Sequence, residues 1–309
     1  MKKVGNLSNQ LAKFNLVFVV FVILWGAWVR LSGSGAGCGE HWPLCNGQAL
    51  PLDQGLKTLT ELTHRLTSGI FGITIFAMTV LGFRKFQKGH PARFWLMASL
   101  ILTIIEALIG AVLVKKGLVD KNDSAMRAIV IGLHLVNTLF LVATIVMSEY
   151  LTRSVEFIKN HLEPKEYKMS AIVFILFLLA GSTGAITALG NTLFPETSLI
   201  EGMKKDFSAT SHFLIQLRIY HPITAVSMVL LLINFSLKNM EFKHTKLTAK
   251  WTLIGAIVAL SFGVVNWLMM APTWGALVHL TLADILWILF VYLIGQKVYQ
   301  KAETNQVLA

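Results

Sequence analysis

Long apolar stretches without a charge constrain this chain more than any other feature. Residues 14–29 and 169–194 contain no Asp, Glu, Lys or Arg. A helix of about 20 apolar residues is long enough to cross the hydrocarbon core of a bilayer. Charged residues make up 14% of the 309 residues, against about 25% in a typical soluble domain. The sequence therefore predicts an all-α protein that crosses the membrane several times.

The apolar stretches predict eight transmembrane helices separated by short polar connections. Gly, Pro or charged residues occur at most of the boundaries, as expected where helices begin and end. The spans are predicted at residues 14–31, 58–83, 93–114, 125–150, 168–190, 211–237, 251–270 and 273–297.

Lys and Arg are distributed unevenly between the two sets of connections. Seventeen fall on the side that holds both termini, and seven fall in the connections on the other side. Positive residues are enriched in cytoplasmic loops, so we expect both termini to lie in the cytoplasm. We expect the protein itself to lie in the plasma membrane. The net charge of +11 is therefore a topology signal and does not indicate nucleic-acid binding.

The two halves of the chain share a pattern. Gly26-Ala27 near the end of the first span matches Gly184-Ala185 near the end of the fifth. His64 and His221 follow these glycines by 38 and 37 residues. Four spans are an even number, so both halves start on the same side and the repeat is parallel. We therefore expect two pseudosymmetric four-helix bundles, with domains at residues 1–160 and 161–309.

Four histidines lie inside the even-numbered spans at a similar depth: His64, His134, His221 and His279. Ionisable residues inside a bilayer are costly and are candidates for function. Two imidazoles that face each other across a four-helix bundle suit the axial positions of a haem iron. A single intramembrane histidine can instead be a hydrogen-bonded packing residue. The matched depth in both halves favours metal or haem ligation for the set.

The two halves differ three residues before the second-helix histidine. Glu61 precedes His64 on one helix face, whereas Arg218 precedes His221. A carboxylate beside a metal centre could move protons, and an arginine could hold an anion such as a haem propionate. A helix-start carboxylate and a snorkelling cation are the alternatives. Glu106 and Asp284 are further intramembrane acids, for which an interhelical hydrogen bond is an equal alternative.

Cys38 and Cys45 are the only cysteines, and both lie in the first connection. This spacing has three interpretations. The cysteines could bind a metal together with His41, form a redox pair, or form a structural disulfide. The predicted topology places the connection outside the cytoplasm, where a disulfide can persist. A disulfide is therefore favoured, with a local role as a lid over the first haem pocket.

The motifs of the first half resemble the haem A synthase family. The stretch Gly26-Ala27-Trp28-Val29-Arg30-Leu31-Ser32-Gly33, followed by Cys38 and Trp42-Pro43-Leu44-Cys45, is similar to the first extracytoplasmic segment of that family. Glu61-Leu62-Thr63-His64-Arg65 looks like its Glu-x-x-His-Arg motif. His134, His221 and His279 fall in the helices where the family has its other haem ligands.

The resemblance implies an enzyme that oxidises the C8 methyl group of haem O to a formyl group, which produces haem A for cytochrome c oxidase. It implies that His64 and His134 hold the substrate haem and that Glu61 is the functional carboxylate. His221 and His279 would be the axial ligands of a resident haem b. Independently of the resemblance, Arg30 and Arg65 near the outer ends of the first two spans could pair with haem propionates or be snorkelling anchors. Haem O synthase, an electron acceptor and a second copy of the chain are candidate partners.

Two features depart from the family pattern. The connection after the fifth span lacks the second cysteine pair of many relatives, and Pro222 follows His221 where an arginine is usual. A proline early in a span kinks or loosens it. The rival functions are a bis-histidine b-type cytochrome for quinol-linked electron transfer and a haem carrier. Glu61 beside His64 and the cysteine connection favour the enzyme.

Overall fold

The eight predicted spans correspond to eight long helices in the computed structural model, which describes residues 2–51, 55–153, 157–160 and 162–301. Within these ranges, eight segments are long and apolar enough to cross a membrane, which confirms the predicted fold class. The predicted domain boundary touches residue 161, and the predicted cytoplasmic tail includes residues 302–309. Both lie outside the described residues. The helices are α1 (Lys2–Leu31), α2 (Leu56–Lys85), α3 (Pro91–Lys115), α4 (Ala125–Leu151), α5 (Pro164–Leu193), α8 (Tyr220–Asn239), α9 (Lys246–Leu268) and α10 (Thr273–Val298).

The sixth span is not one regular helix. It consists of α7 (Phe213–Gln216), the 3₁₀ turn η1 (Leu217–Ile219) and α8. Pro222 explains the irregular turn, because it has no N–H for the carbonyl of Arg218 and its ring would clash with that carbonyl in a regular helix. The predicted loosening before His221 is therefore confirmed. A short helix that the sequence analysis did not predict, α6 (Leu199–Asp206), precedes this span.

Local chemistry sets several helix ends. Ser124 caps α4, since its side chain accepts a hydrogen bond from the Arg127 amide at 3.2 Å. Helix α9 stops at Leu268, two residues before the predicted end, and Met270 and Ala271 have positive φ angles of 62° and 50°. Left-handed backbone cannot continue a right-handed helix, so the chain turns there into α10.

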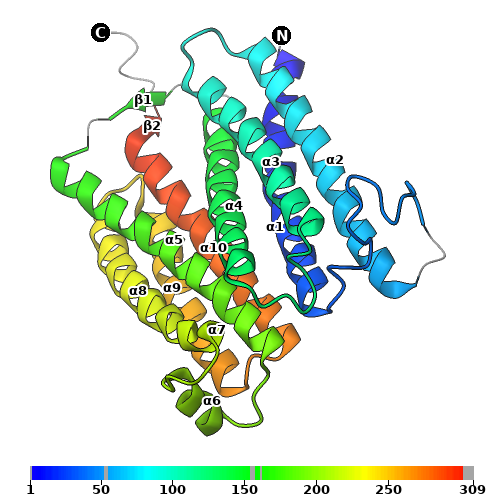
Figure 1. Cartoon of the computed structure of the whole chain (residues 1–309). Helices are drawn as coiled ribbons and strands as arrows, with labels where there is room; N and C mark the ends of the chain where they lie inside the picture. The colour runs from blue at the N-terminus through cyan, green and yellow to red at the C-terminus, as the bar shows by residue number, and fades with distance from the viewer. Residues whose placement is uncertain (1, 52–54, 154–156, 161, 302–309) are drawn as a thin grey trace, which may run out of the picture.

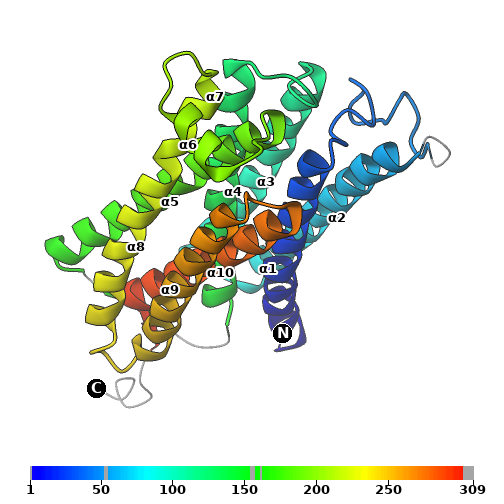
Figure 2. The same cartoon turned by 90° about the horizontal axis from the view of Figure 1, so that it is seen from below.

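The helices pack as two rings of four. In one ring α1 contacts α2, α2 contacts α3, α3 contacts α4 and α4 returns to α1. The second ring repeats this cyclic order with α5, α8, α9 and α10. The rings meet where α4 contacts α5 and α10, and where α1 contacts α10 (Figures 1 and 2). This order is what two four-helix bundles require, and their pseudosymmetry stays a prediction.

The two ends of this assembly differ in their connections. At one end, called here the disulfide end, α1 stops, α2 begins and α6 lies below α5 (Figure 1). At the opposite end, called the terminal end, α1 begins and α10 stops (Figure 1). There β1 (Phe157–Lys159), from the link between the rings, pairs antiparallel with β2 (Tyr299–Lys301). This pairing fastens the link to the end of α10.

Helix α4 lies at the centre of the protein. The most apolar stretch of α4 is 61% buried, whereas that of α3 is 11% buried. The indole of Trp287 in α10 is 1% exposed and donates a hydrogen bond to the Leu139 carbonyl of α4 at 2.9 Å. Packing around Trp287 and Phe290 therefore joins the two rings through α4 and α10.

Candidate functional site

The connection between α1 and α2 is closed by a disulfide between Cys38 and Cys45. The favoured prediction is confirmed, and zinc binding by these cysteines is excluded because a disulfide has no thiolate to offer. The loop lies directly on α2. A Cβ atom at Gly37 would come within 2.5 Å of the Lys57 carbonyl oxygen, so a larger residue could not approach so closely.

Glu61 connects this loop to α2. Its side chain is buried, with Oε2 accepting a hydrogen bond from the Cys38 amide at 2.8 Å. Oε1 pairs with the Arg65 guanidinium at 2.5 Å. Arg65 Nη1 in turn donates to the carbonyls of His41 and Leu44, both at 2.6 Å. Glu61 and Arg65 therefore hold the disulfide loop over the start of α2.

His64 lies one turn beyond Glu61 on α2 and packs against α1. A Cβ atom at Gly26 would come within 2.9 Å of His64 Cε1, so only glycine leaves room for this imidazole. His64 also interacts electrostatically with His134 of α4 and Glu106 of α3. The structure therefore brings His64, His134 and Glu106 into one region inside the first ring.

His134 has a carboxylate beside it. Its Nδ1 lies 3.2 Å from Glu106 Oε1, within ion-pair distance although not aligned for a hydrogen bond. Glu106 also accepts hydrogen bonds from Asn137, at 2.5 Å, and from Thr138. The interhelical hydrogen bond considered for Glu106 is thus present. Its contact with His134 was missed, because sequence spacing does not show which faces of two separate helices meet.

His221 of α8 and His279 of α10 form the matching pair in the second ring. Their ring centroids are 6.2 Å apart. Cβ atoms at Gly184 and Gly263 would each lie 2.9 Å from the Cε1 atom of His221 and His279, respectively. His221 Nδ1 is 3.1 Å from the Ala180 carbonyl oxygen. Gly184 belongs to the sequence repeat, but Gly263 was missed because it lies on a helix without a matching motif.

The spacing of the second pair fits a shared metal. An imidazole nitrogen binds a metal at about 2.0–2.1 Å, so two rings on opposite sides of one ion have centroids roughly 6 Å apart. A backbone carbonyl beside Nδ1 is usual for a ligating histidine, because it directs the other ring nitrogen toward the metal. The observed spacing, the Ala180 contact and the two glycines therefore suit a bis-histidine site.

Two of the three arginines considered for propionate binding are already paired. Arg65 is bound to Glu61. Arg218 is buried, with Nε 2.8 Å from Asp206 Oδ1 and Nη2 3.3 Å from Glu196 Oε1. A hydrogen bond from Lys205 lowers the pKa of Glu196, which keeps this carboxylate ionised opposite Arg218. Arg30 differs, since among the described residues its Nη1 donates to the Ala185 carbonyl, at 3.3 Å, and the side chain has no carboxylate partner.

Asp284 of α10 is 5% exposed, and its Oδ2 has no hydrogen-bond partner within the described ranges. The interhelical hydrogen bond considered for this residue is therefore not seen there. Asp284 has no described contact with either histidine pair, so it stays outside the candidate site.

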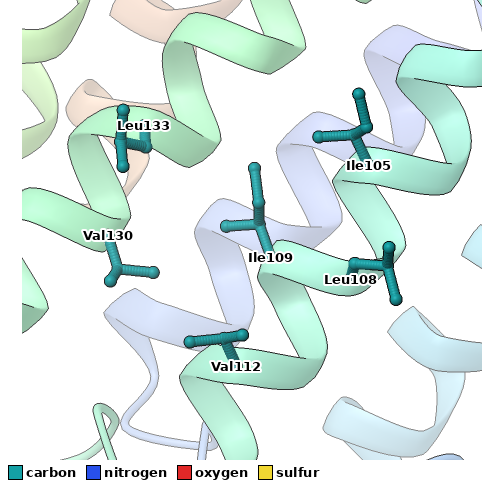
Figure 3. Close-up of a pocket in the computed structure, with 6 residues that line it drawn as sticks. All are labelled: Ile105, Leu108, Ile109, Val112, Val130 and Leu133. Atoms are coloured by element: carbon teal, nitrogen blue, oxygen red, sulfur yellow. The ribbon is translucent and has the colours of Figure 1, made fainter.

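An apolar groove of about 270 Å³ runs between α3 and α4 beside the first pair (Figure 3). Two of its residues are chain neighbours of site residues, since Ile105 precedes Glu106 and Leu133 precedes His134. The groove is lined by Ile105, Leu108, Ile109, Val112, Val130 and Leu133. It has no polar lining, so it suits a hydrocarbon chain and does not itself supply metal ligands.

Comparison with known proteins places this fold and site in a family. The family model COX15-CtaA, described as cytochrome oxidase assembly protein, matches residues 9–291. A protein named protoheme IX farnesyltransferase from Thermus thermophilus is 38% identical over 90% of this chain and 46% of its own length. The chain thus spans about half the length of this relative.

Proteins named heme A synthase match shorter regions. One from Shouchella clausii is 40% identical over 93 residues, which are 30% of this chain and 31% of the relative. Another from Bacillus cereus is 35% identical over 127 residues, 41% of this chain and 40% of the relative. With the family model covering most of its length, the chain belongs to the COX15-CtaA family of cytochrome oxidase assembly proteins.

Proposed function

We propose that this protein is a haem A synthase, which oxidises the C8 methyl group of haem O to a formyl group. The observation that carries the proposal is the pair of histidine sites, one in each ring of helices, with the Glu106 carboxylate beside His134 of the first pair. Glu61 lies one helical turn before His64 and binds the disulfide loop. The second pair, His221 and His279, has a backbone carbonyl as its neighbour.

The second pair is proposed to hold a resident haem b. The imidazole centroids of His221 and His279 are 6.2 Å apart, and Gly184 and Gly263 leave room for the two imidazoles. Both observations support this assignment. A bound haem b would supply one-electron transfer. His221 and His279 would hold its iron, and the Ala180 carbonyl would fix the orientation of the His221 ring.

The first ring is proposed to bind haem O as substrate. His64 and His134 would hold its iron from α2 and α4. In each of two successive hydroxylations the carbon would gain the oxygen of one water molecule and lose two electrons to an external acceptor, with release of two protons. The methyl group would become a hydroxymethyl group and then a gem-diol, which loses water to give the aldehyde. Glu61, fixed by Arg65 and the Cys38 amide, would accept protons released as this carbon is oxidised.

The farnesyl chain of haem O is proposed to lie in the groove between α3 and α4. The groove is apolar, opens on the outer face of these helices and adjoins His134 through Leu133. A hydrocarbon chain gains free energy by leaving water or by packing against such a surface. Substrate would then enter sideways from the lipid.

The membrane orientation is proposed from the distribution of cations. The terminal end carries the 17 Lys and Arg residues that the positive-inside rule assigns to the cytoplasm. The disulfide loop would then face the outside of the plasma membrane, where Cys38 and Cys45 remain oxidised. Haem O synthase is a candidate supplier of substrate, and an electron acceptor is required.

The proposal is tested by expression in a host that makes haem O. Pigments are extracted and separated, and haem A is identified by its retention and mass. The chain with His64→Ala serves as an inactive comparison, and His90→Ala, which changes a histidine between α2 and α3, is the matched control. Haem A should appear with the unchanged chain and the control, and should be absent with His64→Ala.

Two other outcomes would overturn the proposal. Haem b bound by the purified chain without any haem A would favour the bis-histidine cytochrome. Formation of haem O in a host that lacks its synthase would favour farnesyl transfer, the activity in the name of the Thermus thermophilus relative. More than half of that relative lies outside the match, so its name alone does not assign farnesyl transfer to this chain.

A further inference from the structure

Two arginines, the half-buried Arg30 and the buried Arg127, lie at the seam between the two rings of helices. Arg30 is in the last turn of α1, and Arg127 is in the first turn of α4. Helices α1 and α4 pack against each other, and the two residues lie at the same end of them, where the two like charges repel each other. The Nε atoms of both are buried without a hydrogen-bond partner in the described part of the chain. Such a pair of cations is costly in a buried setting unless an anion accompanies it.

Neither arginine is neutralised by a contacting carboxylate within the described ranges. Arg127 is 4% exposed, and its Nη1 donates to the backbone carbonyls of Asp120 and Asn122 at 2.8 and 2.5 Å. The Asp120 charge acts on Arg127 without forming an ion pair. Arg127 also lies at the N-terminal end of α4, where the helix dipole disfavours a cation. The nearby cation, the burial and the dipole together favour binding of an anion here.

The position of the arginines identifies the class of anion. Arg30 follows Gly26, which packs on His64, by four residues, and Arg127 precedes His134 by seven residues. At 1.5 Å per residue, the arginines lie about 6 and about 10 Å nearer the disulfide end than the first histidine pair. A spacing of four residues places Arg30 on roughly the same face of α1 as Gly26. A spacing of seven places Arg127 on roughly the same face of α4 as His134.

Arg30 also reaches the second site. It donates to the carbonyl of Ala185, and the preceding residue, Gly184, packs on His221. Arg30 therefore stands between the two candidate haem sites, with Arg127 on the side of the first. A porphyrin carries two propionate carboxylates on one edge, and guanidinium groups bind carboxylates with charge-assisted hydrogen bonds.

We propose that Arg30 and Arg127 form a carboxylate-binding site that receives a haem propionate at the seam between the rings. This inference rests on the proposed haem-binding function and adds to it a defined orientation, with the propionate edge toward the disulfide end. Arg65 and Arg218 are unsuited to this role because Glu61, Glu196 and Asp206 already occupy them.

The test compares two probes, iron protoporphyrin IX and its dimethyl ester, which lacks the carboxylates. Each is titrated into the purified full chain after haem depletion, and binding is followed by the absorption band of the bound haem. Arg30→Gln and Arg127→Gln are the variants. Arg84→Gln, at an exposed position at the terminal end of α2, is the matched control. Circular dichroism establishes that each variant is folded.

The variants should bind iron protoporphyrin IX about 10-fold or more weakly than the unchanged chain, the factor expected for loss of one charge-assisted hydrogen bond. Their affinity for the dimethyl ester should change little, and the control should match the unchanged chain with both probes. If a Gln variant does not fold, Arg30→Lys and Arg127→Lys keep the charge and should show a smaller loss confined to the free acid.

Two backgrounds identify which haem supplies the carboxylate. One lacks the first pair, through His64→Ala and His134→Ala, and the other lacks the second, through His221→Ala and His279→Ala. If the arginine variants lose affinity only when the first histidine pair is present, the propionate belongs to the substrate haem. If they lose affinity only when the second pair is present, it belongs to the resident haem. Equal affinities of the variants and the unchanged chain for both probes would overturn this inference alone. Failure of the unchanged chain to bind haem would overturn it together with the proposed function.

Discussion

Glu61 of α2 accepts a hydrogen bond from the backbone amide of Cys38 at 2.8 Å, so the disulfide loop and the second helix are held at one carboxylate. A substitution in the loop can therefore act on Glu61 without touching the helix. Replacing Cys38 and Cys45 with serine should lower haem A formation about 10-fold while leaving the haem b spectrum unchanged. Both are measured on the same membranes.

A glycine variant separates loop position from cysteine redox chemistry. Gly37→Ala keeps the disulfide but forces the loop away from Lys57, because the new Cβ would lie 2.5 Å from its carbonyl oxygen. If loop position matters, Gly37→Ala should lose activity like the double serine variant. Gly35→Ala is the matched control, since its Cβ would make an ordinary 3.5 Å contact with Val119. Full activity of Gly37→Ala beside an inactive double serine variant would favour a redox role.

Removal of the Glu61 carboxylate should stop turnover and spare the second site. Glu61→Gln is expected to reduce haem A formation about 100-fold or more, the range typical of a lost acid–base group. Haem b content should remain normal because the described contacts of Glu61 are with α2 and the disulfide loop. Glu40→Gln in the exposed part of the loop is the control. Normal haem A formation by Glu61→Gln would remove this residue from the mechanism.

Glycine-to-alanine variants probe the space for the imidazoles. Gly184→Ala or Gly263→Ala would place a methyl group 2.9 Å from Cε1 of His221 or His279, which must displace the ring. The purified protein should then lose most of its haem b, as measured by the reduced-minus-oxidised spectrum. Gly110→Ala has open space around its Cβ and should retain haem b. Normal haem content in all three variants would contradict the assignment of the second pair.

Glu106 is expected to tune the first site through His134. Substitution of a group that contacts a metal-ligating histidine typically costs about 10- to 100-fold in metal affinity or activity. In a chain without the second pair, Glu106→Gln should weaken haem binding by about this range. Glu241→Gln, exposed in the connection between α8 and α9, is the control. An unchanged affinity would show that the 3.2 Å contact has no part in haem binding.

Filling the groove between α3 and α4 should discriminate between haems. Leu133→Trp is expected to weaken binding of haem O about 10-fold relative to haem B, since only haem O carries the farnesyl chain and loses its apolar contacts. Ile129→Trp, on an exposed part of α4 outside the groove, is the control. An equal effect of Leu133→Trp on both haems would show that the chain lies elsewhere.

The fold was largely predictable because a bilayer demands long apolar helices, which the sequence displays directly. All eight spans were located, and the disulfide followed from the predicted topology. The start of α1 at Lys2, far before residue 14, was not predicted, since its first turns are polar. Helix α6 was also missed, because eight residues with mixed polarity give little periodic signal.

The site was less predictable than the fold. The four histidines could be proposed from their depth, and Glu61 from its position before His64. The partners of Arg218 could not, because Glu196 and Asp206 lie in a connection whose path is set by packing. Arg127 was not among the predicted site residues, because its position relative to Arg30 depends on how α1 and α4 meet. The spacing of residues along one helix can be read from the local sequence. Which faces of two helices contact each other depends on the whole fold.

The central position of α4 limits the directions from which a molecule in the bilayer can reach His134. Its neighbours are α1, α3, α5 and α10, so protein covers most of the helix that carries His134. A molecule dissolved in the bilayer therefore has no approach to His134 from the side of the second ring. A lipid-borne substrate would instead reach the first site through the groove between α3 and α4, so the protein would have one open and one closed side within the plane of the membrane.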